Sequence, residues 1–235
     1  MKIVFTPDWF LGKDVLIDVF SFLVLFAFFI LCVRYYKLNK KRNFLSLGTG
    51  FLLIALAQLA TILTKFVLYY DTSFIQTIGQ MVITYKIVNT VNIFYHVGFF
   101  FQRFLTLIGL YVIYKIPSHK KVKDLFPMDY LLILLALVGL AVLSIIAYWV
   151  FHLAVILFLA LITSNYLKVY KENKSRNTRI LIIAFALLAL AHLIYFMSPF
   201  SILYVLANLI ELVSYLILLF LIIRLLRCNN ALCRA

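Results

Sequence analysis

The sequence predicts an all-α integral membrane protein, built as a bundle of seven transmembrane helices. The chain has 235 residues, of which 66% are hydrophobic and only 13% are charged, whereas a soluble domain is nearer half apolar and a quarter charged. Its apolar residues form runs that suit the ~20 helical residues a bilayer core requires, and short basic or polar breaks separate these runs. We therefore expect a single membrane domain over residues 1–235, located in the cell membrane.

The spans follow from the apolar runs in order. Residues 128–170 carry almost no break, yet as one helix they would be about twice as long as the hydrocarbon core. Both flanks, "KIPSHKKVK" and "KVYKENKSRNTR", are basic and belong on the same side of the membrane. We therefore expect two helices with a tight turn near Ser144–Trp149. The run that ends at residue 115 takes one span, preceded by a helical extension from about Thr77. The predicted spans are residues 15–36, 44–70, 91–115, 128–147, 148–170, 180–197 and 201–226.

The basic residues predict the orientation. The formal net charge is +14, but the lysines and arginines come in short clusters between the apolar runs rather than on one solvated face, so the charge does not indicate nucleic-acid binding. Cytoplasmic loops carry such clusters, which places the N-terminus outside and the C-terminus inside. The clusters are Arg34, Lys37, Lys40, Lys41 and Arg42; Lys115, Lys120, Lys121 and Lys123; Lys168, Lys171, Lys174, Arg176 and Arg179; and Arg224, Arg227 and Arg234.

Two spans carry polar residues on one helical face. At 100° per residue, Asn89, Asn92, His96 and Arg103 share an arc of ~60°, as do Tyr204, Asn208, Glu211 and Tyr215 in the last span. Such seams face the interior of a bundle, because charged side chains at membrane depth are costly. Arg103 and Glu211 lie at similar predicted depth, so we expect them to form a buried pair. Lys65 and Asp18 lie at similar outer depth and are expected to contact each other in the same way.

These residues are the candidate functional site. Ionisable residues inside a membrane are functional candidates by default, whereas single buried amides more often serve only to join helices. No catalytic residue and no cofactor is predicted. Three histidines lie in the outer halves of different spans: His96, His152 and His192. They have no local metal-binding spacing, and they would be metal ligands only if the protein were a membrane-embedded hydrolase. The predicted ligand-binding or switch residues are Arg103, Glu211, Asn89, Asn92, His96, Asn208, Lys65 and Asp18.

The span count and orientation resemble those of opsins and of seven-helix sensor modules. Opsins attach retinal through a lysine in the last span, and residues 202–226 contain none, so covalent retinal is not expected. Small seven-helix sugar transporters are similar in span count and orientation too, but they carry prolines inside their spans. Here the prolines lie in the tail or loops: Pro7, Pro117, Pro127 and Pro199.

The function predicted first is a sensor or receptor-like module with an outward-facing polar seam. A small ligand, a proton or lipid would enter its outer half, and a cytoplasmic effector protein would contact its basic inner loops. The alternatives are a small-solute or proton-coupled transporter with Glu211 as the titrating group, a membrane-embedded metal hydrolase, and a scaffold subunit without chemistry. The lipid bilayer is the one partner common to all four.

Overall fold

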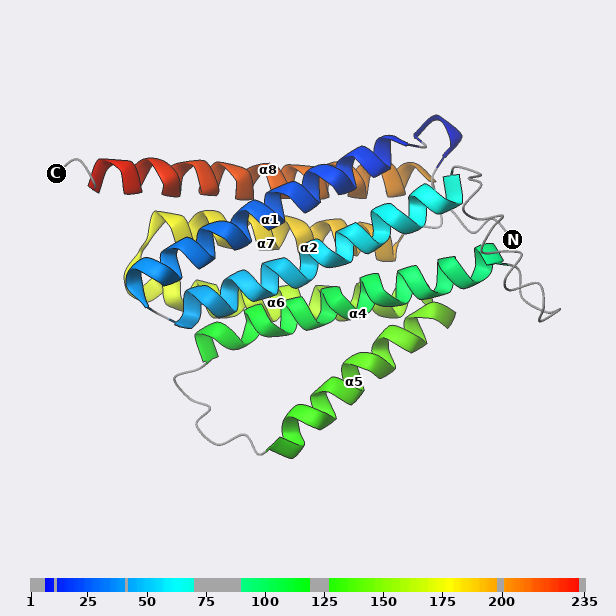
Figure 1. The fold of residues 1–235 in the computed structure, drawn as a ribbon, viewed down its shortest axis with the longest axis horizontal. Helices are drawn as coiled ribbons and strands as arrows, with labels where there is room; N and C mark the ends of the chain where they lie inside the picture. Colours follow the sequence, from blue (N-terminus) through cyan, green and yellow to red (C-terminus); the bar gives the residue numbers. More distant parts are fainter. Residues whose placement is uncertain are drawn as a thin grey trace.

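The computed structural model describes residues 7–10, 12–40, 42–69, 90–118, 127–197 and 201–232. Within these ranges the chain is all-α (Figure 1). The predicted extension from Thr77 lies outside the described residues. The elements are the 3-10 turn η1 (Asp8–Phe10) and the helices α1 (Lys13–Asn39), α2 (Arg42–Tyr69), α4 (Thr90–Ser118), α5 (Pro127–Ile146), α6 (Tyr148–Asn173), α7 (Arg176–Phe196) and α8 (Ser201–Leu232).

Six of these helices are long and apolar enough to cross a membrane: α1, α2, α4, α6, α7 and α8. In α5 the apolar stretch measured over described residues is shorter, Leu132–Ile145. The turn expected near Ser144–Trp149 is present, because α5 ends at Ile146 and α6 begins at Tyr148, with Ala147 extended between them (φ −120°, ψ 90°). The chain is thus a helical membrane bundle. Its opsin-like orientation remains a prediction.

The six long helices form a closed ring. Neighbours pack in the order α1, α2, α4, α6, α7 and α8, and α8 packs back against α1. Helix α5 packs on α4 and α6 from outside this ring, and Figure 1 shows it inclined away from the other helices. The bundle is therefore a ring of six helices with α5 appended to one side.

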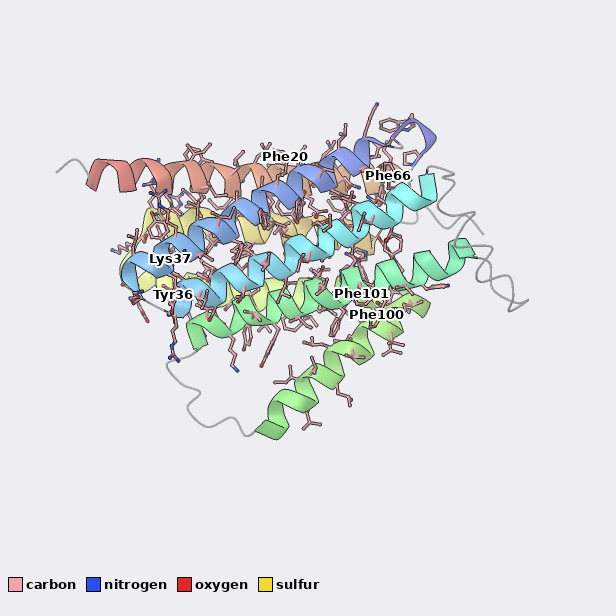
Figure 2. All side chains as sticks on the ribbon, in the orientation of Figure 1. Phe20, Tyr36, Lys37, Phe66, Phe100 and Phe101 are labelled. Atoms are coloured by element: carbon pink, nitrogen blue, oxygen red, sulfur yellow. The ribbon has the colours of Figure 1, made fainter. Side chains whose placement is uncertain are left out.

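The two ends of the ring differ in charge. At one end, here named the basic end, α1, α4, α6 and α8 finish and α2 and α7 begin (Figure 1). Lys40 and Lys174 end α1 and α6 there in the left-handed conformation, and the backbone N–H of each donates to the carbonyl four residues earlier. Figure 2 shows Tyr36 and Lys37 at this end and Phe66 towards the other. The opposite end is named the cavity end.

The outer surface of the ring is apolar, unlike the surface of a soluble protein. Large apolar side chains are exposed along the outer faces of the helices, a pattern that lipid accepts and water does not. On α8 they recur every three or four residues along its length and form one continuous outward stripe. The stripe consists of Ile202, Leu206, Leu209, Val213, Leu216, Phe220 and Ile223.

Aromatic side chains fill the ring towards the basic end. Phe51 of α2 lies 4.4 Å between ring centroids from Phe28 of α1 and 6.3 Å from Phe185 of α7, and Phe185 lies 6.0 Å from Tyr166 of α6. Phe51 and Phe185 are each 1% exposed. We name these four residues the aromatic plug. They join four of the six ring helices across the interior.

Glycines allow α2 and α4 to approach closely. A Cβ added to Gly50 would lie 3.0 Å from the carbonyl oxygen of Gly109, and one added to Gly109 would lie 2.8 Å from that of Gly50. Each hypothetical Cβ would also lie 2.6 Å from an isoleucine side chain, Ile113 or Ile54. Small residues at such contacts are typical of helix association in membranes.

Candidate functional site: a polar cavity inside the ring

A partly open cavity of about 130 Å³ lies inside the ring. Residues from all six ring helices line it, and α5 contributes none of them. Polar side chains line it at the cavity end, and apolar side chains such as Ile54, Leu110 and Leu159 line it towards the aromatic plug. The polar and ionisable lining residues are Asp18, Gln58, Thr61, Lys65, Gln102, Arg103, Thr106, Tyr148, His152, His192, Tyr195, Tyr204, Asn208, Glu211 and Tyr215.

Glu211 of α8 is surrounded by neutral hydrogen-bond donors. Its Oε1 accepts from Tyr215 Oη at 3.1 Å and from Gln58 Nε2 at 3.5 Å, and its Oε2 accepts from Tyr195 Oη at 3.2 Å. Gln58 Nε2 also lies 3.4 Å from Tyr215 Oη. These contacts connect α2, α7 and α8 around one partly buried carboxyl group.

The predicted ion pair between Arg103 and Glu211 is not formed, although both residues line the same cavity. Among the described residues the ion pairs are those of Lys65. Arg103 instead donates from Nη1 to Ser144 Oγ at 3.2 Å, and its guanidinium carbon lies 5.8–5.9 Å from the ring centroids of Phe99, Tyr148 and Phe151. Aromatic faces attract guanidinium groups at this range. Arg103 is only 3% exposed and connects α4 to the corner between α5 and α6.

The expected contact between Lys65 and Asp18 is present, and it includes a third residue. Lys65 Nζ lies 2.6 Å from Asp18 Oδ2 and 3.0 Å from Asp14 Oδ2. Asp14 and Asp18 are one helical turn apart on α1 and so present their carboxylates on one face. All three side chains are buried. This group, named the acidic triad, joins α1 to α2 beside the cavity.

Two histidines meet on the wall formed by α6 and α7. His152 Nδ1 lies 2.9 Å from His192 Nδ1, so the N–H of one ring donates a hydrogen bond to the bare nitrogen of the other. The Tyr195 ring packs on both, with centroids 5.2 Å from His152 and 5.8 Å from His192. His152 is 4% exposed, and its Nε2 is buried with no hydrogen-bond partner among the described residues.

The remaining predicted site residues divide into three cases. Asn208 lines the cavity, but its Nδ2 donates to the Tyr204 carbonyl one turn earlier at 2.9 Å. His96 is exposed on α4. Asn89 and the side chain of Asn92 lie outside the described part of the structure. Among the described residues no three histidine, cysteine or acidic side chains gather in a metal-binding group, so His152 and His192 meet without a third ligand of this kind.

Sequence reasoning missed several members of the site. Tyr215 lies on the predicted polar face of the last span, but its contact with Glu211 was not predicted. Gln58 and Tyr195 were not among the predicted site residues, and both reach Glu211. Ser144 was expected only as part of a turn. A serine or tyrosine in an apolar sequence says little about its partners. Serine is common between packed membrane helices, and tyrosine is common at the membrane interface.

Comparison with known proteins adds no assignment: no family model, no curated protein and no solved structure matches this chain. The class defined by the fold and the cavity is that of a helical, multi-pass membrane bundle.

Proposed function

We propose that this chain is a receptor-like membrane bundle that binds a small molecule in the polar cavity, without covalently attached retinal. The observation that carries the proposal is the cavity itself, which is lined by all six ring helices and is polar at one end only. A ligand there would touch every helix of the ring, so it would favour whichever arrangement of the helices it binds best. A scaffold without chemistry would be expected to pair its buried polar groups with one another and to leave no cavity between them.

The aromatic plug favours a receptor over a carrier. A carrier needs polar groups or an opening that reaches both faces, whereas the interior here is apolar from Ile54 and Leu159 through Phe51 and Phe185 to the basic end. Many carriers have helices that are broken near the midplane, and the described ring helices are continuous. The transporter alternative would therefore require the plug to open.

The proposed mechanism places the ligand outside and the response inside. In the orientation predicted by the basic clusters, the cavity end faces outward in the cell membrane and the basic end faces the cytoplasm. A ligand that draws α8 and α7 towards α2 would shift their far ends, where an effector protein would read the change. The described basic residues at that end are Arg34, Lys37, Lys40, Arg42, Lys115, Lys168, Lys171, Lys174, Arg176, Arg179 and Arg224.

Neutral single-ring compounds test the cavity directly. An apolar cavity of about 150 Å³ can hold benzene, so toluene and benzyl alcohol are suitable probes for purified protein in detergent. At about ten times Kd either probe should raise the unfolding midpoint by a few degrees. The variant Thr106→Phe, which fills the cavity from α4, should abolish the shift.

The matched control is Thr49→Phe. Thr49 is half-buried on α2 but does not line the cavity, so this variant should respond to the probes as the unaltered protein does. A response that is absent in every protein, or that persists in Thr106→Phe, would contradict the proposal.

A further inference from the structure

We infer that the cavity's ligand carries a primary ammonium group that binds the Glu211 carboxylate. The inference rests on the proposed function and names the chemical class of its ligand: a small organic amine, protonated at neutral pH, with an apolar body. It is carried by four features of the cavity, namely the acceptor capacity of Glu211, the distribution of buried charge, the aromatic walls and the unsatisfied nitrogen of His152.

Glu211 has acceptor capacity to spare. An ionised carboxylate offers about four lone-pair positions on its two oxygens. Among the described residues, two donors approach Oε1 and one, Tyr195, approaches Oε2. Hydrogen bonds from hydroxyl groups to carboxylates are usually ~2.5–2.7 Å long, whereas those to Glu211 span 3.1–3.5 Å. With respect to its described partners, the carboxylate therefore has acceptor capacity left on Oε2 for a stronger donor from the cavity.

No described cation neutralises Glu211. Lys65 is engaged by Asp14 and Asp18, and Arg103 lies against Ser144 and three aromatic rings. The charged side chains that line the cavity are Asp18, Glu211, Lys65 and Arg103, and neither of the two cations forms an ion pair with Glu211. A monocation in the cavity would give this carboxylate a direct counter-charge, which matters at membrane depth because an unpaired charge is costly there.

Aromatic rings form walls next to the carboxylate. Tyr195 and Tyr204 lie 5.6 Å apart between ring centroids, and Tyr148 and Tyr215 also line the cavity. Aromatic faces attract ammonium groups within about 6 Å, and the attraction increases when water is excluded. The hydroxyls of Tyr195 and Tyr215 meanwhile hold the carboxylate in place. Rings and carboxylate together favour a cation over an anion or a neutral molecule.

His152 supplies a second acceptor on the same cavity. When its Nδ1 carries the proton shared with His192, its Nε2 has a free lone pair, and that atom has no partner among the described residues. The Tyr195 ring lies against the His152 ring while its hydroxyl reaches Glu211. A primary ammonium has three N–H donors and so can serve more than one acceptor. A quaternary ammonium has none.

Benzylamine and benzyl alcohol test the inference, because they share a body and differ in charge. For the unaltered protein in detergent at pH 7, benzylamine should bind at least about tenfold more tightly than benzyl alcohol in thermal-shift titrations. In Glu211→Gln this preference should disappear while benzyl alcohol binding is retained, which also shows that the variant is folded. Glu211→Asp, which keeps the charge on a shorter side chain, should retain part of the preference.

The control substitution is Glu172→Gln, the same chemical change at an exposed position near the basic end of α6. It should leave the preference for benzylamine intact. Equal binding of the two probes, or a preference that survives Glu211→Gln, would overturn the inference and leave the cavity proposal standing. Failure of benzyl alcohol and toluene as well would remove both. If Glu211 carries a proton in place of a ligand cation, benzylamine and benzyl alcohol should bind equally.

Discussion

Lys65 Nζ lies 2.6 Å from Asp18 Oδ2 and so joins α2 to α1, two helices that are each long and apolar enough to cross a membrane. The same ammonium lies 3.0 Å from Asp14 Oδ2. Removing one partner of a buried ion pair typically costs ~3–5 kcal/mol, because the remaining charge is left uncompensated, whereas replacing the whole group by neutral residues is often tolerated. The acidic triad is therefore a place where single and multiple substitutions should differ in effect.

The first prediction concerns this triad. Lys65→Met should lower the free energy of unfolding by about 3 kcal/mol or more, since two carboxylates lose their shared cation. Adding Asp14→Asn and Asp18→Asn to the same chain should recover most of the loss. Lys168→Met, at an exposed position on α6, should change stability by less than ~0.5 kcal/mol. Denaturant unfolding in mixed micelles measures all three, and a triple variant less stable than Lys65→Met would contradict the prediction.

The second prediction concerns the partners of Arg103. A double-mutant cycle of Arg103→Gln with Tyr148→Leu should give a coupling energy of ~0.5–2 kcal/mol, as expected for a desolvated cation over an aromatic face. A cycle of Arg103→Gln with Glu211→Gln should give less coupling, because no ion pair joins those residues. Thermal unfolding in detergent supplies the energies. Stronger coupling to Glu211 than to Tyr148 would mean that the guanidinium turns towards the carboxylate.

The third prediction concerns the glycine contact between α2 and α4. Gly109→Ala should destabilise the protein, because the new methyl group would lie 2.8 Å from the Gly50 carbonyl oxygen and 2.6 Å from Ile54 Cγ1. Overpacking of this kind costs ~1–3 kcal/mol. Gly139→Ala on α5 is the matched control, since a Cβ there meets nothing within 4 Å, and alanine is favoured over glycine in a helix by up to ~1 kcal/mol. The unfolding midpoint should fall in Gly109→Ala and rise in Gly139→Ala. An unchanged midpoint in Gly109→Ala would show that α2 and α4 separate easily.

The fourth prediction concerns the histidine pair. His192→Phe should cost ~1–3 kcal/mol, because it removes the Nδ1 partner of His152, whose Nε2 already has no hydrogen-bond partner among the described residues. His152→Phe should cost less, since His192 is only partly buried and can turn its polar atoms to the cavity. The double variant should be at least as stable as His192→Phe. Calorimetry of the three variants measures their order of stability. A larger loss of stability in His152→Phe than in His192→Phe would contradict the prediction.

Helical periodicity predicted which faces are polar but not which side chains meet. It placed Arg103 and Glu211 towards one interior, and both line the cavity. Their pairing was inferred from equal depth alone, and depth is one coordinate of three. The lateral arrangement of α4 and α8, which are not neighbours in the ring, has no counterpart in the sequence pattern. Aromatic rings and hydroxyl groups consequently became the partners of both charges.

The contact between Lys65 and Asp18 was predictable for the converse reason. Helices α1 and α2 are consecutive, joined by a short break, and packed against each other. Two adjacent antiparallel helices leave little freedom beyond depth, so equal depth on facing sides nearly implies contact. Asp14 lies on the same face of α1 as Asp18, one turn earlier, but it was not among the predicted site residues. Helix α5 is more apolar than the ring helices, but a uniformly apolar sequence does not say which neighbours a membrane helix packs against.

The direction of the helices has an electrostatic consequence. Four ring helices, α1, α4, α6 and α8, begin at the cavity end, while α2 and α7 finish there. Each helix N-terminus carries a partial charge of about +0.5 and each C-terminus about −0.5, so aligned peptide dipoles give the cavity end of the ring a net positive contribution. Asp14 lies in the first turn of α1, where that field favours a carboxylate. At the basic end, Lys37, Lys115 and Lys171 lie in the last turns of their helices. The backbone thus helps to hold acids at one end of the bundle and bases at the other.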